Sequence, residues 1–465
     1  MAHQSRQRKA MLVVEHMKCI LETMRDHFKQ ERVFQLFQSH IVSNLEMPGR
    51  HTISNVLCFK GTSDKDWSRD YRLFSTSQWD VKGCMNSILQ QGLKELPSLP
   101  FIPIMIDLTS LRKHGKKIPF TNYQVDPLSP PFHKGLMWGQ RLLHASLMIP
   151  MHDYSLPARG VPIRLEMAPY VKKPGKKASI EEFKAYKEER KLRNANVQAM
   201  KMVKELRDQC ESSKKLLIVA DGGFCNKHCF RALPENVDLL VRCRKDSKLC
   251  YKSNTGRSFY GADKFTPEEV RKNTDLALHK TKVFYGGDWR DVEYKEVINL
   301  YWQRGGERRP LRLLVMKPMP YRKTGSGNDN YRDPCYLLTT DLSTSAYELI
   351  QAYFNRPEIE QNHRDMKNSL GLGQAQVWSE VSVEKHPQTI MLGYSILLLA
   401  ILRACGPMRD SKEYLPPPKW YRGRKRPTIE DMRRKLRQEL TCRPEYREYF
   451  GIRVPWGAAT SKLVA

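Results

Sequence analysis

YFNRPEIEQNHRDMK, residues 353–367, is the stretch of sequence that decides the fold and the chemistry of this chain. Four of its side chains, Tyr353, Arg356, Glu360 and Lys367, are separated by three, four and seven residues. At about 100° per residue, this spacing brings them to one side of a helix as a narrow polar stripe. A carboxylate suits a hard cation, whereas arginine and lysine suit phosphate, so the stripe favours chemistry on metal-bound phosphate.

The same stripe has a plainer interpretation, because charged residues at helical spacing also form ordinary salt bridges on a solvent-facing helix. Pro357 lies inside the stretch and cannot donate a backbone hydrogen bond. We therefore expect the helix that carries Glu360 to begin near Arg356, with the preceding segment as a separate turn or helix. Glu358 is the competing acid, but it lies about 200° from Glu360 around a helix and cannot share the side of Arg356 and Lys367.

The spacing resembles the Y-(2)-R-(3)-E-(6)-K signature of the insertion sequence 4 family, a branch of the cut-and-paste DDE transposases, and all four positions are filled. Pro357 departs from the common pattern. The resemblance implies an α/β fold with an RNase H-like catalytic domain of the retroviral-integrase type. It also implies that Glu360 is a catalytic, metal-binding acid and that Tyr353, Arg356 and Lys367 bind DNA phosphates.

Two further acids are expected at the ends of neighbouring strands. PFIPIMIDLTS, residues 100–110, contains a continuous apolar run of strand length, which Asp107 ends and for which Pro103 is the first residue. A second apolar strand, residues 216–220, ends in Asp221. An acid followed by Gly-Gly is also a common plain turn. In an RNase H-like strand order, however, the two strands are parallel neighbours about 4.8 Å apart, so their carboxylates would converge.

The rest of the chain alternates between strand and helix patterns. We expect strands at 142–149, 162–167, 237–242, 292–302, 311–316 and 335–340, and helices at 180–210, 226–233 and 428–441. Ser343 or Thr344 can cap the helix that runs toward Tyr353. The apolar run 390–402 is too short to span a bilayer and is expected to be a buried helix.

This pattern divides the chain into five parts. We predict a helical, DNA-binding domain at 1–98, the first part of an RNase H-like catalytic domain at 99–245, a mostly β insertion at 246–334, the second part of the catalytic domain with its Glu-bearing helix at 335–405, and a Pro-rich basic tail at 406–465. In the resembled family an N-terminal region binds the terminal repeats, and several members carry an insertion between the second Asp and the Glu.

The two ends of the chain leave alternatives open. In the first part, Thr52 or Ser54 can cap a short helix after a basic turn, as in a helix-turn-helix-like DNA reader, although a plain helical cap on the next domain fits equally. Its aromatic residues are expected in the core: Trp67, Tyr71, Phe74 and Trp79. The tail is either an arm that contacts DNA or a second subunit, or solvated disorder.

Composition indicates the partner and the compartment. The formal net charge of +29 predicts a polyanionic partner, with DNA or RNA ahead of a membrane surface. Eleven scattered cysteines indicate reduced cytoplasmic thiols. The one tight cluster, Cys225, His228 and Cys229, is not followed by a second pair at zinc-like spacing. The start of the sequence is basic and leads into an amphipathic helix, so we expect no signal peptide.

These observations predict an enzyme that acts on DNA. Asp107, Asp221 and Glu360 would hold two Mg²⁺ or Mn²⁺ ions for cleavage at the ends of a bacterial insertion sequence and for strand transfer into target DNA. The expected partners are the terminal inverted repeats, the target DNA and a second subunit, in the bacterial cytoplasm and at the nucleoid. In the resembled family a tryptophan of the insertion stacks on a flipped base, so the resemblance makes Trp302 and Trp289 candidates for this role, although a core role is the simpler interpretation for Trp302.

Two other functions fit the same sequence. An RNase H-fold nuclease, acting as a junction resolvase or a host nuclease, would cut strands without joining them. A catalytically inactive, transposase-derived protein would bind DNA and keep its acids only as parts of the fold.

Overall fold

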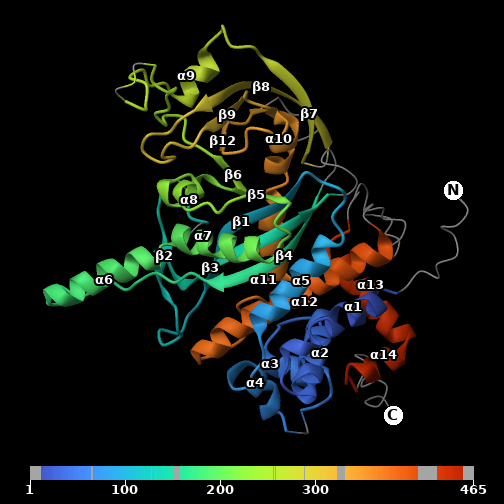
Figure 1. The fold of residues 1–465 in the computed structure, drawn as a ribbon. Helices are drawn as coiled ribbons and strands as arrows, with labels where there is room; N and C mark the ends of the chain where they lie inside the picture. The colour runs from blue at the N-terminus through green and yellow to red at the C-terminus, as the bar shows by residue number, and fades with distance from the viewer. Residues whose placement is uncertain are drawn as a thin grey trace, which may run out of the picture.

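The computed structural model describes residues 12–63, 66–126, 128–130, 132–150, 158–254, 256, 258–286, 288–321, 330–406 and 427–453. Ten strands of this part of the chain form one mixed sheet, flanked by helices (Figure 1). Its order is β2-β3-β1-β5-β6-β12-β9-β8-β7, and β4 also pairs with β3. The fold is thus α/β, as the sequence predicts.

The first six strands in chain order are β1 (Phe101–Arg112), β2 (Asn122–Val125), β3 (Leu136–Ile149), β4 (Arg159–Met167), β5 (Lys215–Ala220) and β6 (Val237–Arg242). β1 is antiparallel to β3 and parallel to β5, and β5 is parallel to β6. The predicted parallel pairing of the first strand with the strand before Asp221 is confirmed. β2, which is only four residues long, was not predicted from the sequence.

Two details predicted for β1 are wrong. Asp107 does not end the strand, because pairing with β3 continues to Arg112. Pro103 is the third residue of the strand and not the first. The ladder with β3 begins only at Ile104, so the missing N–H of Pro103 lies outside it.

The two faces of β1 contribute to different parts of the core. Ile104 and Ile106 belong to a large core that includes the apolar residues of α12 (Glu380–Cys405). Phe101 and Met105 belong to a second core, which is closed by α10 (Ala346–Phe354) and α11 (Pro357–Asn368). Because side chains alternate along a strand, Asp107 continues the face of Met105 and therefore lies on the side of α10 and α11.

α12 is the central helix of the larger core. At 26 residues it is longer than the predicted 390–402, and within the described part of the chain it alone has the length and apolar composition that could cross a membrane. Its most apolar window is 78% buried inside the protein. The prediction that the run is too short is therefore wrong in length, whereas burial of the helix is confirmed.

Residues 12–63, 66–93 and 427–453 form one helical unit that packs around α12 (Figure 1). Its helices are α1 (Val13–Glu22), α2 (Glu31–Glu46), α3 (Ile53–Phe59), α4 (Ser68–Ser75), α5 (Val81–Leu93), α13 (Ile429–Cys442) and α14 (Pro444–Tyr449). Thr52 caps α3, as predicted, by accepting a hydrogen bond from the Asn55 N–H. Phe74 and Trp79 are buried, but Trp67 is 57% exposed, so its predicted core role is wrong.

Tyr71 is 37% exposed, and its predicted core role is also wrong because it lies with Trp67 on the outer side of α4. The predicted basic helix 428–441 corresponds to α13. Its buried Arg433 donates a hydrogen bond to the Leu45 carbonyl at 2.7 Å. Residues 427–453 are therefore a packed part of the helical unit, which excludes solvated disorder for them. The start of the chain and most of PPPKWYRGRKRP, residues 416–427, lie outside the described residues.

The predicted helix 180–210 is two helices, α6 (Ile180–Leu192) and α7 (Ala195–Asp208), because Asn194 caps α7 by accepting a hydrogen bond from Asn196. α6 projects from the body of the protein and has no buried residue (Figure 1). The predicted short helix is α8 (Lys227–Arg231).

The strands of the predicted insertion extend the main sheet: they are β7 (His279–Tyr285), β8 (Asp288–Leu300) and β9 (Leu311–Met316). β9 pairs with β12 (Cys335–Thr339), the strand predicted at 335–340 in the second part of the catalytic domain, and β12 pairs with β6. A separate pair is formed by β10 (Pro320–Tyr321) and β11 (Asn330–Tyr331). α9 (Pro267–Lys272) lies against β9. The stretch KTGSGND, residues 323–329, lies outside the described residues. The cap of α10 is Ser345, and not Ser343 or Thr344, both of which hydrogen-bond to Asp341 instead.

The carboxyl end of α11 is attached to the turn between α2 and α3. The Asn44 side chain donates to the Leu370 carbonyl, and the His51 N–H donates to the Gln374 side chain at 2.8 Å. Between these contacts, Gly371 adopts a φ of +74°, and a Cβ added there would overlap the Cβ of His51. The helical unit therefore holds the end of α11 through a contact that has no room for a side chain.

This contact predicts that Gly371→Ala destabilises the protein more than a matched change at Gly49, which has a φ of +81° and nothing within 4 Å of an added Cβ. Gly49→Ala should lower the free energy of unfolding by about 1 kcal/mol, because only backbone strain is added. Gly371→Ala should lower it by about 3 kcal/mol, because overlap with His51 adds to the strain. Urea unfolding measures the free energy of unfolding of both variants. Equal losses for Gly371→Ala and Gly49→Ala would contradict the close contact between Gly371 and His51.

Candidate active site

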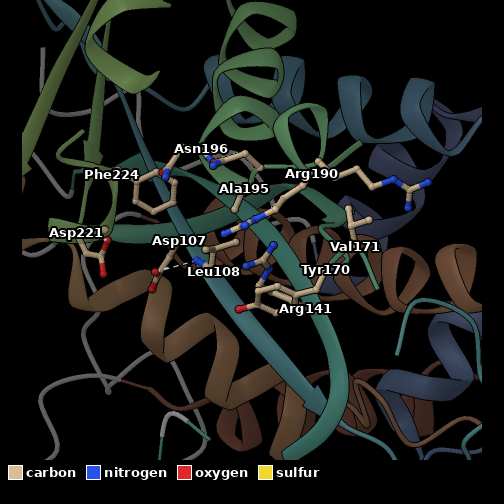
Figure 2. A pocket seen from close by; sticks show the side chains of 13 residues that line it. Asp107, Leu108, Arg141, Tyr170, Val171, Arg190, Ala195, Asn196, Asp221 and Phe224 are labelled. Carbon is tan, nitrogen blue, oxygen red and sulfur yellow. Dashed lines mark hydrogen bonds between the residues drawn. The ribbon is translucent and has the colours of Figure 1, made fainter. Parts of the chain in front are cut away.

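Asp107 lies on β1, and Asp221 directly follows the neighbouring strand β5. The paired register of β1 and β5 ends with Met105 and Val219, and each acid lies two residues beyond its strand's member of that pair. Parallel strands are about 4.8 Å apart. Both acids line one cavity of about 470 Å³, called the first cavity here, and Figure 2 shows their carboxylates side by side at its edge.

Each of these acids has one oxygen fixed by its own backbone. The Leu108 N–H donates to Oδ1 of Asp107 at 2.9 Å, and the Gly223 N–H donates to Oδ1 of Asp221 at 2.8 Å. Asp221 thereby caps the short helix η2 (Gly222–Phe224). The Gly-Gly sequence after Asp221 therefore forms a turn whose N–H orients the carboxylate. The plain-turn interpretation and a role for the acid are thus compatible.

The signature stretch is divided between two helices. α11 begins at Pro357, with Arg356 as its cap, so the predicted start near Arg356 is confirmed. Tyr353 lies in the last turn of α10. The prediction of a stripe on a single helix is therefore wrong for Tyr353, because a proline at the first helical position starts a new helix there. Glu360 and Lys367 are both on α11.

Arg356 lies between two of the acids. Its Nη1 is 2.5 Å from Oε1 of Glu360, and its Nη2 is 3.8 Å from Oδ2 of Asp107. The arginine side chain is only 16% exposed, and its Nε is buried without a hydrogen-bond partner in the described structure. Arg356 is therefore the internal counter-ion that joins β1 to the helix of Glu360.

Glu360 lines a different cavity from the two aspartates. Its side chain is 54% exposed and borders a second cavity of about 620 Å³, together with Arg242, Tyr353 and Arg356. The two cavities lie on either side of the Arg356 bridge, because Asp107 borders the first and Glu360 borders the second. The third acid is thus adjacent to the aspartate pair but separated from it by a guanidinium group.

The electrostatics of Asp107 reflect this crowding. The pKa of Asp107 is raised to about 6: burial is the largest cause, Asp221 and Glu360 add to the rise, and the positive charge of Arg356 opposes it. Burial lowers the pKa of Lys367, and Asp107 opposes that shift. The three predicted acids and the two predicted cations therefore act on one another through a partly desolvated site.

Tyr353 lies at the edge of this group. Burial raises the pKa of its phenol, with Cys335 as the next cause, and Arg356 opposes the rise. The ring packs edge-on against Phe354 and borders the second cavity. The phenol therefore stays protonated and can donate a hydrogen bond to a phosphate oxygen.

A hard divalent cation fits the aspartate pair. Asp107 and Asp221 offer carboxylate oxygens to one cavity, and their mutual repulsion is the kind that such an ion relieves. Within the described ranges, no three His, Cys, Asp or Glu side chains are grouped so as to hold a metal ion. Glu360 could complete such a group only by exchanging its contact with Arg356.

The two candidate tryptophans occupy different environments. Trp302 follows β8, packs edge-on against Phe230 and sits against the larger core. A Cβ on Gly305 would overlap its ring. Trp289 is 43% exposed and packs edge-on against Phe284. Base stacking by either remains a prediction.

Several residues that border the cavities were not found from the sequence. Arg141 on β3, Tyr170 after β4 and Arg190 on α6 line the first cavity. Arg242 at the end of β6 and Tyr285 at the end of β7 line the second. These residues come from distant parts of the chain, and no motif joins them. The register of Arg141 with Ser110, next to the Asp107 segment, appears only once β3 is paired.

Comparison with known proteins supports an enzyme of DNA transposition. Residues 190–395 match the family model described as the transposase DDE domain. The match covers less than half of the chain and includes Asp221 and the 353–367 stretch, but not β1 with Asp107. A search of curated proteins found no match.

The raised pKa of Asp107 predicts the stability of Asp107→Asn without metal. Below pH 4 Asp107 is protonated in both the folded and the unfolded protein, so it does not lower the free energy of unfolding. Because the folded form keeps it up to about pH 6, the wild type loses stability as the pH rises from about 4 to 6, by at most about 3 kcal/mol. Asparagine has no charge to bury, so the variant should be the more stable protein at pH 7.5.

Urea unfolding in EDTA at pH 4.5 and pH 7.5 measures the difference in free energy of unfolding between Asp107→Asn and the wild type. This difference should be smaller at pH 4.5 than at pH 7.5. Asp208→Asn, which changes an exposed acid on α7, is the control for the loss of one carboxylate. A wild type that is as stable as Asp107→Asn at pH 7.5 would show that Arg356 fully compensates the buried charge.

Proposed function

We propose that the chain is a DDE transposase of a bacterial insertion sequence, which cleaves the ends of its element and transfers the freed strand into target DNA. The observation that carries the proposal is the pairing of β1 with β5, which brings Asp107 and Asp221 to the edge of one cavity beside the helix of Glu360. The match of residues 190–395 to the transposase DDE domain supports it independently. The strand order β4-β3-β1-β5-β6 supports an RNase H-like catalytic domain of the insertion sequence 4 type.

The three acids hold divalent metal in this proposal. Asp107 and Asp221 face one cavity, and Glu360 joins them when Arg356 turns to a phosphate of the DNA. Two bound Mg²⁺ or Mn²⁺ ions would supply an activated water and stabilise both the entering and the leaving oxygen of an in-line displacement. No covalent nucleophile of the protein is needed.

The residues of the signature stretch bind the DNA backbone. Arg356 has a planar guanidinium that can hold a phosphate through two hydrogen bonds, and Lys367 on the same helix adds a point charge. Tyr353 donates its phenolic proton to a neighbouring phosphate. Together they orient the scissile phosphate over the acids and offset charge as it develops.

The net charge of +29 suits a protein that holds several DNA segments at once. We propose that the helical unit reads the terminal inverted repeats, and that two subunits pair the element ends before cutting. The setting would be the cytoplasm, at the nucleoid.

Cleavage of DNA with defined ends tests the proposal. Purified protein is incubated with Mg²⁺ and a labelled duplex that carries the DNA flanking the gene, in which inverted repeats are expected. Asp107→Asn, Asp221→Asn and Glu360→Gln should each lower the single-turnover cleavage rate by roughly 10²–10³-fold or more, because each removes a charged group that acts on the transition state.

Glu358→Gln is the matched control. Glu358 lies on α11 two residues from Glu360 but approaches the Gly160 N–H at 3.4 Å, away from the aspartate pair, so cleavage should persist. Undiminished cleavage by any of the three acid variants would remove that residue from the site. Cutting without joining to a second labelled duplex would favour the nuclease or resolvase function, and binding without cutting would favour an inactive DNA-binding protein.

A further inference from the structure

The first cavity joins the aspartate pair to a basic wall. Asp107 and Asp221 form one edge, and the wall that runs away from them carries Arg141, Arg190 and Arg193. These arginines come from β3, from α6 and from the connection between α6 and α7. Figure 2 shows Arg141 and Arg190 beyond Asp107, on the side opposite Asp221. Arg356, the cap of α11, contacts Asp107 but lines the second cavity and not the first.

Arg141 is held in one orientation. Its guanidinium carbon lies 3.7 Å from the centre of the Tyr170 ring, and its Nε donates to the Ala168 carbonyl at 2.8 Å. Figure 2 shows the arginine and the tyrosine stacked next to Leu108. Stacking and the backbone contact fix the plane of the guanidinium, so its two Nη groups are preorganised donors beside the acids.

The remaining cations of the wall are less constrained. Arg190 is exposed, and in the described structure it makes no hydrogen bond or ion pair. Arg193 is paired with Glu189 at 2.9 Å, which reduces its net contribution. The wall therefore has two guanidinium groups without an acidic partner in the described structure, one of them held in a fixed orientation and the other exposed.

We infer that the first cavity is a binding site for the phosphodiester backbone of one DNA strand, with Arg141 stacked on Tyr170 as its fixed phosphate clamp and Arg190 as a second contact. This inference rests on the proposed function, because it assigns the path of the strand that the acids cut. The strand crosses Asp107 and Asp221 between two sets of cations, one on α11 and one on this wall. A cavity of about 470 Å³ suits a short piece of a single strand.

Equilibrium binding tests the inference without cleavage. A fluorescein-labelled single-stranded oligonucleotide of mixed sequence is titrated with protein in EDTA over a range of salt concentrations. Arg141→Ala and Arg190→Ala should each raise Kd by about tenfold and lower the slope of log K against log salt by about 0.7, the value for one lost phosphate contact on a single strand.

Tyrosine variants separate stacking from charge. Tyr170→Phe keeps the ring beneath Arg141 and should bind as the wild type does, whereas Tyr170→Ala should weaken binding without removing a charge. Arg141→Lys keeps the charge but loses the planar stack, and should fall between wild type and Arg141→Ala. Lys204→Ala, on an exposed position of α7 outside both cavities, is the control for losing one positive charge.

The inference is overturned if Arg141→Ala and Arg190→Ala match Lys204→Ala in both Kd and salt slope. Arg190 is exposed, so its variant stays informative even if Arg141→Ala alters folding. Failure of the proposed function is seen separately: the wild type would then bind DNA through this wall without cutting it in Mg²⁺. If cleavage occurs but the wall variants bind normally, only the strand path is wrong.

Discussion

A buried carboxylate next to a second acid is the constraint around which the site is built. Pairing of β1 with β5 brings Asp107 and Asp221 to the edge of one cavity, where burial raises the pKa of Asp107 and the charge of Asp221 adds to the rise. Arg356 supplies the compensating charge within the chain by contacting both Asp107 and Glu360. The break between α10 and α11 allows this contact, because Pro357 starts a new helix immediately after the arginine.

The sequence predicted the acids of the candidate site better than the residues that surround them. Asp221 could be found because a strand pattern and a Gly-Gly turn both lie next to it in sequence. Asp107 could be found as an acid on a strand, but not as a residue in the middle of one, since the length of β1 is set by β3 some thirty residues later. Arg141 and Tyr170 were missed for the same reason, because a cavity wall built from distant segments leaves no local pattern.

The composition of the sequence predicted separate domains, whereas in the structure parts of these domains share one apolar core. The helices near the amino terminus, α13 and one face of the sheet share a single apolar core around α12. Such long-range packing is invisible to periodicity, which reports only which side of each helix is apolar. Trp67 and Tyr71 illustrate the limit, since both are aromatic and both are largely or partly exposed. Asn194, by contrast, is a local signal, and a closer examination of capping residues would have divided the long helix correctly.

The position of Arg356 has a consequence for ion selectivity. The guanidinium is part of the chain and always lies beside the acids, so under the proposed metal binding an incoming ion would compete with a neighbour that cannot diffuse away. A sodium or potassium ion would bring no more charge than the arginine already provides and would gain little by displacing it. A small doubly charged ion would gain considerably more from the same oxygens. In the proposed metal-bound state, Arg356 would thus favour ions of high charge density over the more abundant monovalent ions.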